Sequence, residues 1–383
     1  MVDVAASSSS LPGGASDSSP AAPVAPLSPA PAAAVSEEGV PVFGGFVGIV
    51  DSAALGGLAA SHRLGGREPM AALRRHVRRK SWVYVFAATP EMSLALALVD
   101  GAVTGTAFLM ATDLTTGESL VGSSRKLALA AVNDAPGDGL HASYRLPGTR
   151  YSVDRRDDEV RVQVSLARSV LPRPGPSRPW VELDLTLRET GVGITAISEV
   201  QHGDASAVSV TAKTAGMAVS GTLQVHGDGA GRRFVLDGGF GGYDYTQGLL
   251  PRHTAWRWAY GTGRLADGTV LGLNLVEGFS GIGERSRENA LWIDGSPVAL
   301  DARTRFEFDR SDVMSPWSIT TADGAVRLRF DPVAAHDERL DLKLLRSLFI
   351  QPVGHFSGEV DAGGRTYVLD RVPGVVEDQD ILW

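Results

Sequence analysis

The stretch Val181-Glu-Leu-Asp-Leu-Thr-Leu-Arg188 alternates apolar and polar residues without interruption. A period of two is typical of a β-strand that buries one face and exposes the other. The same spacing of leucines recurs from Leu94 to Leu98 and from Leu271 to Leu275. These segments predict that half-buried strands, rather than helices, are the main elements of the fold.

Asp-Gly pairs separate many of the apolar segments. They supply the positive φ angles that tight hairpin turns need. Repeated hairpins predict an all-β, antiparallel protein built from sandwiches or barrels, with little helix. The pairs are Asp100-Gly101, Asp138-Gly139, Asp228-Gly229, Asp237-Gly238, Asp267-Gly268, Asp294-Gly295 and Asp323-Gly324.

Composition bounds the class of protein. The chain has 383 residues, 43% of them hydrophobic, which is enough for one large domain or two smaller ones. Its formal net charge is −8, and a negative surface repels phosphate backbones, so we expect no nucleic-acid partner. The absence of cysteine excludes disulfides, thiolate metal ligands and cysteine nucleophiles, and fits a reducing cytoplasm.

Membrane and secretion signals are weak. No stretch reaches the roughly 18 consecutive apolar residues that a transmembrane helix needs. The N-terminus lacks the basic start and apolar stretch of a secretory signal, because Asp3 is its first charge and Ser7 to Ser10 are polar. We therefore expect no transmembrane segment and a cytoplasmic location.

The chain divides by composition and by one turn. Residues 1–40 are rich in Ala, Pro and Ser, so we predict a disordered tail; a proline-rich ligand for a partner domain is the alternative. Gln201-His202-Gly203-Asp204 reads as a turn. It predicts a boundary between an N-terminal β domain at 41–203 and a C-terminal β domain at 204–383.

One short segment has helical spacing. Met70, Leu73 and Val77 lie three and four residues apart beside a basic cluster. The cluster is either the solvated face of a helix or a contact for an anionic ligand or a membrane surface. Its residues include Arg74, Arg75, Arg78, Arg79 and Lys80.

Common cofactor and metal motifs are missing. Gly261-Thr-Gly-Arg-Leu-Ala266 matches a relaxed dinucleotide fingerprint, but a hairpin turn follows it, where that motif needs a helix. The sequence has no P-loop, Gly-x-Ser-x-Gly or His-Glu-x-x-His, and its eight histidines are scattered. We predict no metal site and no cofactor.

The hairpin from Thr254 to Phe279 turns at Asp267-Gly268. A two-residue loop pairs Ala266 with Thr269, and it places Trp258 opposite Glu277. This register predicts that Arg257 and Asn274 share one face of the hairpin. It predicts a second, apolar face made of Trp256, Trp258, Tyr260, Leu273, Leu275, Glu277 and Phe279.

Glu277 is the anomaly on that apolar face. Burial would raise the pKa of its carboxyl and suit it to act as a general acid. The alternative is a structural pair with Arg285 or Arg287. Glu288 either caps a turn or brings a second carboxylate near Glu277. Tyr243-Asp244-Tyr245, in a glycine-rich stretch, predicts close approach of a ligand or a crowded barrel corner.

Seven short sequence blocks follow one another in a characteristic order along the chain: Lys80–Tyr84, Gly239–Thr246, Thr254–Trp258, Gly272–Phe279, Glu288–Trp292, Gln351–Gly358 and Pro373–Asp378. Through these blocks the chain resembles, from about Phe43 to Trp383, a bacterial family known as domain of unknown function 2804 (DUF2804). More remotely, the chain resembles tandem lipocalin-like proteins of the AttH and carotenoid-hydratase type, which implies two lipocalin-like β-barrels or sandwiches packed together.

Two functions fit this sequence. In the first, an enzyme binds an apolar, terpenoid-like molecule at a barrel mouth or interface, and Glu277, with Asp244 or Glu288, moves a proton to drive hydration, cyclisation or isomerisation. In the second, the protein only carries such a lipid-like ligand. The residues predicted to line the ligand site are Trp256, Arg257, Trp258, Tyr260, Asn274, Tyr243, Tyr245, Trp292 and His355.

The chain ends in an apolar triplet, Ile381-Leu382-Trp383, beyond the acidic residues Glu377, Asp378 and Asp380. A free terminus would leave a large indole in water. We therefore predict that the C-terminus docks on the fold.

Overall fold

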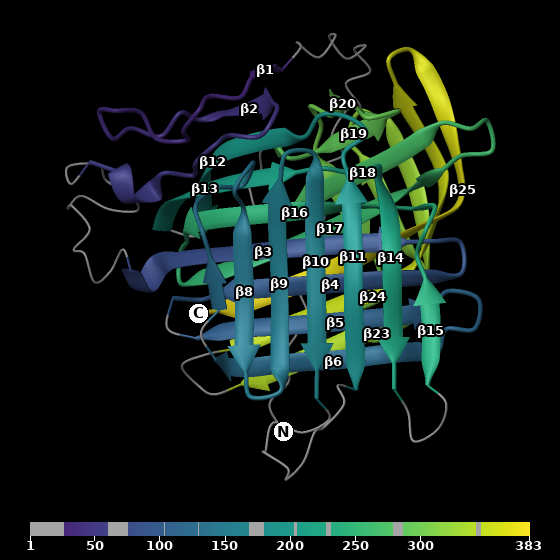
Figure 1. Ribbon diagram of the computed structural model, residues 1–383. Coiled ribbons are helices and arrows are strands. Elements are labelled where there is room, and N and C mark those ends of the chain that lie inside the picture. The colour runs from purple at the N-terminus through teal and green to yellow at the C-terminus, as the bar shows by residue number, and fades with distance from the viewer. Residues whose placement is uncertain are drawn as a thin grey trace, which may run out of the picture.

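The chain folds into two antiparallel sheets with almost no helix, as the alternating pattern predicts (Figure 1). The one short helix with assigned bounds is a 3₁₀ turn, η1 (Leu55–Gly57). No helix in the described part of the chain is long and apolar enough to cross a membrane. The computed structural model describes residues 27–59, 76–102, 104–128, 130–167, 180–202, 205–226, 231–278, 286–341 and 346–383.

The first sheet has sixteen strands and branches at β16, which pairs with β3 along one edge and with β13 and β14 along the other. Its pairs are antiparallel except for the parallel pair of β1 with β2. The strands are β1 (Ser28–Pro29), β2 (Gly44–Val47), β3 (Arg79–Ala88), β4 (Met92–Asp100), β5 (Gly105–Asp113), β6 (Ser119–Ala128), β7 (Ala130–Val132), β8 (His141–Leu146), β9 (Thr149–Arg156), β10 (Glu159–Leu166), β11 (Val181–Arg188), β12 (Ile194–His202), β13 (Ala205–Lys213), β14 (Met217–Val225), β15 (Arg232–Val235) and β16 (Gly239–Leu249).

The second sheet has nine strands in the order β20-β19-β18-β17-β25-β24-β23-β22-β21. They are β17 (His253–Arg264), β18 (Val270–Glu277), β19 (Ala290–Ile293), β20 (Ser296–Ala299), β21 (Thr304–Glu307), β22 (Trp317–Thr321), β23 (Val326–Asp341), β24 (Arg346–Ala362) and β25 (Arg365–Leu382).

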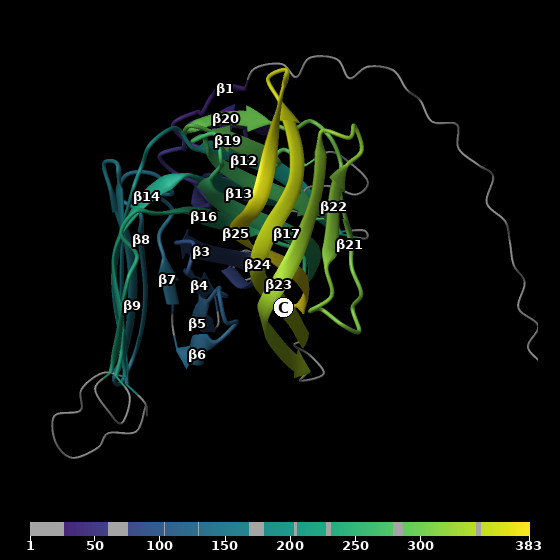
Figure 2. The same cartoon turned by 90° about the vertical axis from the view of Figure 1, so that its right-hand side faces the viewer.

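The two sheets form three layers (Figure 2). The first sheet folds over on itself, so that β8 to β11 and β14 lie in front of β3 to β6 and β16 (Figure 1). The second sheet packs on the other side of β3 to β6 and β16, which makes these strands the middle layer.

Side chains at alternate positions of the middle strands pack into two different cores. On β4, Leu94, Leu96 and Leu98 point into the core of the first sheet, while Ala95 and Ala97 point into the interface with the second sheet. A third apolar core lies within the curved second sheet. The side chains that β4 presents to the interface between the sheets are therefore small, and one of them, Ala97, lines the candidate site.

Two predicted boundaries differ from the observed arrangement of strands. The predicted division at 203/204 falls inside the hairpin of β12 and β13, which belong to one sheet; the chain changes sheet between Leu249 and His253. Within the predicted tail, residues 27–40 are ordered, because the N–H of Ala30 donates to the carbonyl of Val47 at 2.8 Å and Ala34 is buried in the first core. Residues 1–26 lie outside the described residues.

The predicted basic helix is only partly described. A helical turn covers residues 76–78, and the strand β3 begins at Arg79, which forms an ion pair with Asp100 at 2.7 Å. Lys80 is buried, donates to the carbonyl of Gly101 at 3.0 Å, and has its pKa lowered by burial to about 8. These two residues are therefore not on a solvated helix face. Met70, Leu73, Arg74 and Arg75 lie outside the described residues.

Candidate functional site

A cavity of about 90 Å³ lies between the middle layer and the second sheet. Aromatic and aliphatic side chains form its walls, and buried charged groups form its floor. Its lining residues are Trp82, Tyr84, Ala97, Val99, Phe108, Lys213, Asp244, Thr246, Trp256, Trp258, Val276, Glu288, Phe349, Glu377, Gln379 and Trp383.

Side chains at alternate positions of β16 face the cavity. Asp244 and Thr246 face the interface, whereas Tyr243 and Tyr245, at the alternate positions, face the first core. Asp244 is paired in register with Lys213 of β13 on one side and with Tyr84 of β3 on the other. The sheet therefore presents a lysine, an aspartate and a tyrosine in one row.

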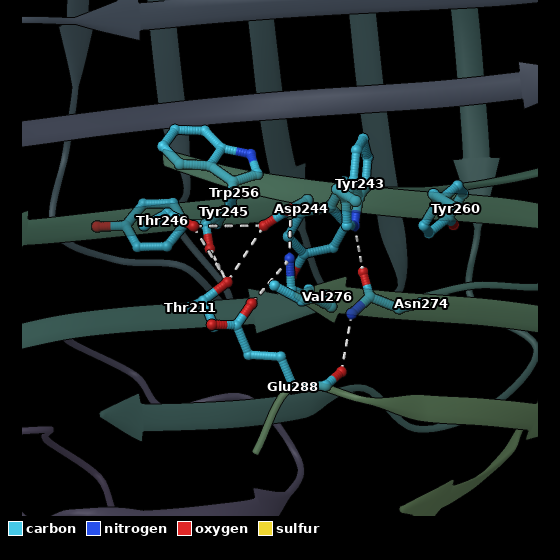
Figure 3. A network of polar contacts seen from close by, with 12 residues as sticks. Thr211, Tyr243, Asp244, Tyr245, Thr246, Trp256, Tyr260, Asn274, Val276 and Glu288 are labelled. Atoms are coloured by element: carbon cyan, nitrogen blue, oxygen red, sulfur yellow. Dashed lines mark hydrogen bonds and ion pairs between the residues drawn. The ribbon is translucent and has the colours of Figure 1, made fainter. Parts of the chain in front are cut away.

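The floor is a buried ion cluster. The ammonium of Lys213 contacts Asp244 directly and lies 3.5 Å from Glu288, and all three side chains are almost fully buried. The hydroxyl of Thr211 donates to Asp244 Oδ1 at 3.2 Å (Figure 3). Three charges placed together out of water need such partners, because an isolated buried charge is costly.

Asn274 on β18 fixes the position of Glu288. Trp258 donates from Nε1 to Asn274 Oδ1 at 2.7 Å, and Asn274 donates from Nδ2 to the carbonyl of Glu288 at 2.8 Å (Figure 3). Trp258 also offers its ring face to the Lys213 ammonium, which lies 5.7 Å from the ring centroid. Asn274 thus joins the aromatic wall to the charged floor.

Glu377 on β25 faces the same cavity, and its described hydrogen-bond donors are neutral side chains. It accepts hydrogen bonds from Trp256 Nε1 at 2.8 Å and from Gln351 Nε2 at 2.9 Å, and is only 6% exposed. Burial raises the pKa of its carboxyl to about 7, the nearby Asp244 adds to the rise, and the two hydrogen bonds oppose it.

Tyr84, on the opposite sheet, is hydrogen-bonded to Glu377 through Gln351. Its hydroxyl donates to Gln351 Oε1 at 3.3 Å, so Gln351 bridges Tyr84 and Glu377. Burial raises the pKa of Tyr84 well above its usual value, and the charge on Glu377 acts in the same direction. Tyr84 is therefore a neutral hydroxyl at physiological pH.

Half-buried indoles surround the mouth. Trp82 stacks on Trp256 across the two sheets, with ring centroids 5.9 Å apart. Trp383 donates from Nε1 to Thr254 Oγ1 at 2.9 Å, and its own N–H donates to the carbonyl of Arg252. The C-terminus is therefore docked, as predicted, and its last residue contributes to the cavity wall.

The predicted register of the β17–β18 hairpin is wrong by one residue. Leu265 pairs with Thr269 around a three-residue loop, so Trp258 lies opposite Val276 and Arg257 opposite Glu277. Gly268, at φ +92°, allows this loop. A shift of one residue moves every side chain to the other face.

Glu277 consequently lies on the opposite face of the sheet from the cavity. Its carboxylate accepts from Arg257 Nη1 at 2.7 Å, so its described partner is neither Arg285 nor Arg287. Arg285 and Phe279 lie outside the described residues. Arg257 in turn faces Asp378, away from the cavity.

The structure gathers only part of the predicted site. Asp244, Glu288, Trp256 and Trp258 line the cavity, and Asn274 supports it. Besides Glu277 and Arg257, five predicted residues lie away from the cavity. Tyr260 donates to the carbonyl of Thr214 behind the wall, and Trp292 donates to that of Val192. Tyr243 and Tyr245 face the first core, and His355 is buried elsewhere on β24.

Sequence reasoning missed four central residues: Glu377, Gln351, Lys213 and Tyr84. Glu377 and Gln351 stand within blocks that carry the family resemblance, and Tyr84 within a third. Their meeting depends on which strands become neighbours, which no local pattern encodes. The described residues contain no group of three His, Asp or Glu side chains placed to hold a metal ion.

The family model of DUF2804, a domain of unknown function, matches residues 61–383, so the chain belongs to this family. A search of curated proteins finds no match.

Three solved structures are similar over 79% of this chain. CghA with Sch210972 has 15% identity, TM-score 0.46 and 88% of its chain covered. Kievitone hydratase from Nectria haematococca has 14% identity, TM-score 0.40 and 88% covered. An AttH-type protein from Nitrosomonas europaea has 12% identity, TM-score 0.34 and 92% covered. These values are too low to transfer an activity.

Proposed function

We propose that this protein is an enzyme in which Glu377 transfers a proton to an apolar small molecule bound between the two sheets. One observation carries the proposal: a buried carboxyl with a pKa of about 7 faces an aromatic cavity. A group with a pKa near the working pH both donates and accepts protons efficiently. A buried group in a cavity whose pKa is strongly shifted by its surroundings is a candidate for a functional site.

The neighbouring groups suit proton transfer to carbon. Glu377 gives its proton to a carbon–carbon double bond, and a cationic centre forms on the adjacent carbon. Water then adds to that centre and returns a proton to the carboxylate, which is hydration. Loss of a proton from a neighbouring carbon to the carboxylate instead gives isomerisation. Cyclisation follows when a second double bond of the same molecule attacks the cationic carbon and forms a carbon–carbon bond, and the new cation then loses a proton to the carboxylate. The indoles of Trp256 and Trp258 stabilise the cation through their ring faces, and the floor carboxylates Asp244 and Glu288 add negative charge.

Cavity size favours an enzyme over a carrier. Pockets that enclose a drug-sized ligand measure roughly 300–1,000 Å³, whereas this one measures about 90 Å³. It admits the reactive end of a molecule, while a longer apolar tail would lie at the half-buried mouth formed by Trp82, Trp256 and Trp383. A lipid carrier needs to cover most of its ligand, and this cavity does not.

The test uses trisubstituted alkenes, from 2-methylbut-2-ene to linear terpenoids, incubated with the full chain in D₂O. We expect carbon-bound deuterium in the product by mass spectrometry, and a loss of at least about 100-fold in Glu377→Gln, the usual scale for a general acid.

Glu277→Gln is the matched control, since it changes the same residue type on the other face of the sheet. It should keep the wild-type rate within about twofold if the two sides of the sheet act independently. Equal activity of Glu377→Gln and wild type would remove Glu377 from the reaction.

A further inference from the structure

The described lining of the cavity carries more negative than positive charge. Three carboxyl groups, Asp244, Glu288 and Glu377, face a single cation, Lys213. Over these four described side chains, the sum is −1 with Glu377 protonated and −2 with Glu377 ionised. No arginine or histidine belongs to the described lining. An anionic ligand would therefore meet repulsion that water cannot screen in a buried site.

Lys80 is a second cation close to a wall residue of the cavity, and its described contacts are with other groups. Lys80 lies over the ring of Trp383, with its ammonium 5.3 Å from the centroid. Its ammonium donates to the carbonyls of Val77 and Gly101, and Lys80 is not part of the described lining. Its charge therefore lies outside the described lining and is not counted in the sum above.

The walls offer the second feature that a cation needs. Electron-rich ring faces attract cations, most strongly when the site is shielded from water. Trp258 already holds the ammonium of Lys213 at 5.7 Å in this way. The rings that line the cavity are Trp82, Tyr84, Phe108, Trp256, Trp258, Phe349 and Trp383.

The volume sets the size of the group. A dry cavity of roughly 150 Å³ binds benzene, and this cavity, at about 90 Å³, is smaller. A centre that carries three or four methyl-sized substituents matches it better than an extended chain or a fused ring.

We propose that the cavity selects a compact positive centre surrounded by alkyl groups, either a resident alkylammonium or the carbocation formed when the substrate is protonated. The carbocation case rests on the proposed function, and the alkylammonium case does not. In both cases the rings surround the alkyl groups and Asp244 and Glu288 balance the charge.

Binding of tetramethylammonium to the full chain tests the inference against tert-butanol, a neutral molecule with the same number of heavy atoms. Calorimetry and indole fluorescence at constant ionic strength give both affinities. We expect tetramethylammonium to bind at least tenfold more tightly. Equal or weaker binding of the cation would overturn the proposal.

Two variants assign the binding to this cavity. Glu288→Gln removes one floor charge and should weaken tetramethylammonium binding at least fivefold, with little change for tert-butanol. Trp82→Leu removes a ring at the mouth without touching the ion cluster, so it covers the case in which Glu288→Gln does not fold. Glu277→Gln is the control and should bind like wild type. Cation binding that neither Glu288→Gln nor Trp82→Leu weakens would place it elsewhere and overturn the inference.

The same probes separate this inference from the proposed function. Alkene turnover that tetramethylammonium inhibits competitively supports the carbocation source, and cation binding without any alkene turnover supports the resident alkylammonium. Deuterium transfer that depends on Glu377, without preference for the cation, leaves the proposed function standing and overturns this inference alone.

Discussion

Glu377 and Asp378 are consecutive carboxylates on β25, and both are buried, with 6% and 2% of their surfaces exposed. Because successive side chains of a strand point to opposite faces, Glu377 faces the cavity between the sheets and Asp378 faces the interior of the second sheet. Glu377 is held by two neutral N–H groups, from Trp256 and Gln351. Asp378 is held by two guanidinium groups, 2.9 Å from Arg310 and 3.4 Å from Arg257.

The difference shows that burial alone does not mark a functional acid. A carboxylate between two arginines is a fixed charge whose loss leaves cations unpaired. A carboxylate among neutral donors keeps its proton near pH 7 and is free to give it away. The partners, rather than the depth, distinguish structural Asp378 from Glu377.

The largest stability effect should follow from Asp378→Asn. The change leaves the half-buried Arg257 with one carboxylate instead of two and removes the partner of Arg310. Breaking a buried ion pair on one side typically costs 3–5 kcal/mol, and we expect roughly 3 kcal/mol because Arg310 can turn to solvent. Urea denaturation at pH 7 measures the change in the free energy of unfolding. A cost below about 1 kcal/mol would contradict the structural role that distinguishes Asp378 from Glu377.

Glu377→Gln should change the pH dependence of stability. The folded-state pKa of about 7 lies above the ordinary 4.5, so the folded state holds a proton that the unfolded state has released between these values. Wild-type stability therefore falls as pH rises from 4.5 to 7, by up to roughly 3 kcal/mol. The variant lacks this slope.

Denaturation midpoints between pH 4.5 and 8 measure the two slopes. We expect Glu377→Gln to gain stability relative to wild type from pH 4.5 to about 7 and the gain to level off above that pH, whatever the stability of the variant at pH 4.5. Parallel curves would show that the Glu377 carboxyl is ionised throughout, and its role as a proton donor would then fail.

Gln351→Leu removes one of the two neutral hydrogen-bond donors to Glu377, and so tests whether these donors set the pKa of Glu377. The hydrogen bond from Gln351 favours the ionised form of Glu377, so its loss should raise the pKa of Glu377 further. A shift of one unit corresponds to about 1.4 kcal/mol, and we expect about one unit. Carbon-13 NMR of labelled glutamate follows the titration; an unchanged or lower midpoint would contradict the assigned hydrogen bond.

Local patterns predict the strands well because alternation records which face each residue buries. Leu94 to Leu98 and Val181 to Arg188 lie in β4 and β11 as the spacing indicates. The tail shows the limit of composition: residues 27–40 are ordered by backbone hydrogen bonds and by burial of Ala34, which amino-acid content does not encode.

The candidate site was less predictable for two physical reasons. One loop residue reverses the face of a whole strand, and this moved Glu277 away from the aromatic wall. The remaining members meet only through long-range pairing: Lys213, Asp244 and Tyr84 form one row, while Glu377 arrives from the last strand of the other sheet. Neither the order of strands in a sheet nor the packing of two sheets follows from periodicity.

The smallest effect should come from Glu277→Gln, in the same ion cluster as Asp378. Glu277 and Arg257 form a close pair, but their side chains are 32% and 29% exposed. Water screens partly exposed pairs, which usually contribute less than about 1 kcal/mol. Arg257 also keeps Asp378, so no buried charge is left alone. Urea denaturation of both variants under the same conditions should show a smaller loss of stability for Glu277→Gln than for Asp378→Asn. Equal losses would mean that the ion cluster acts as one unit, in which Asp378 contributes no more to stability than Glu277.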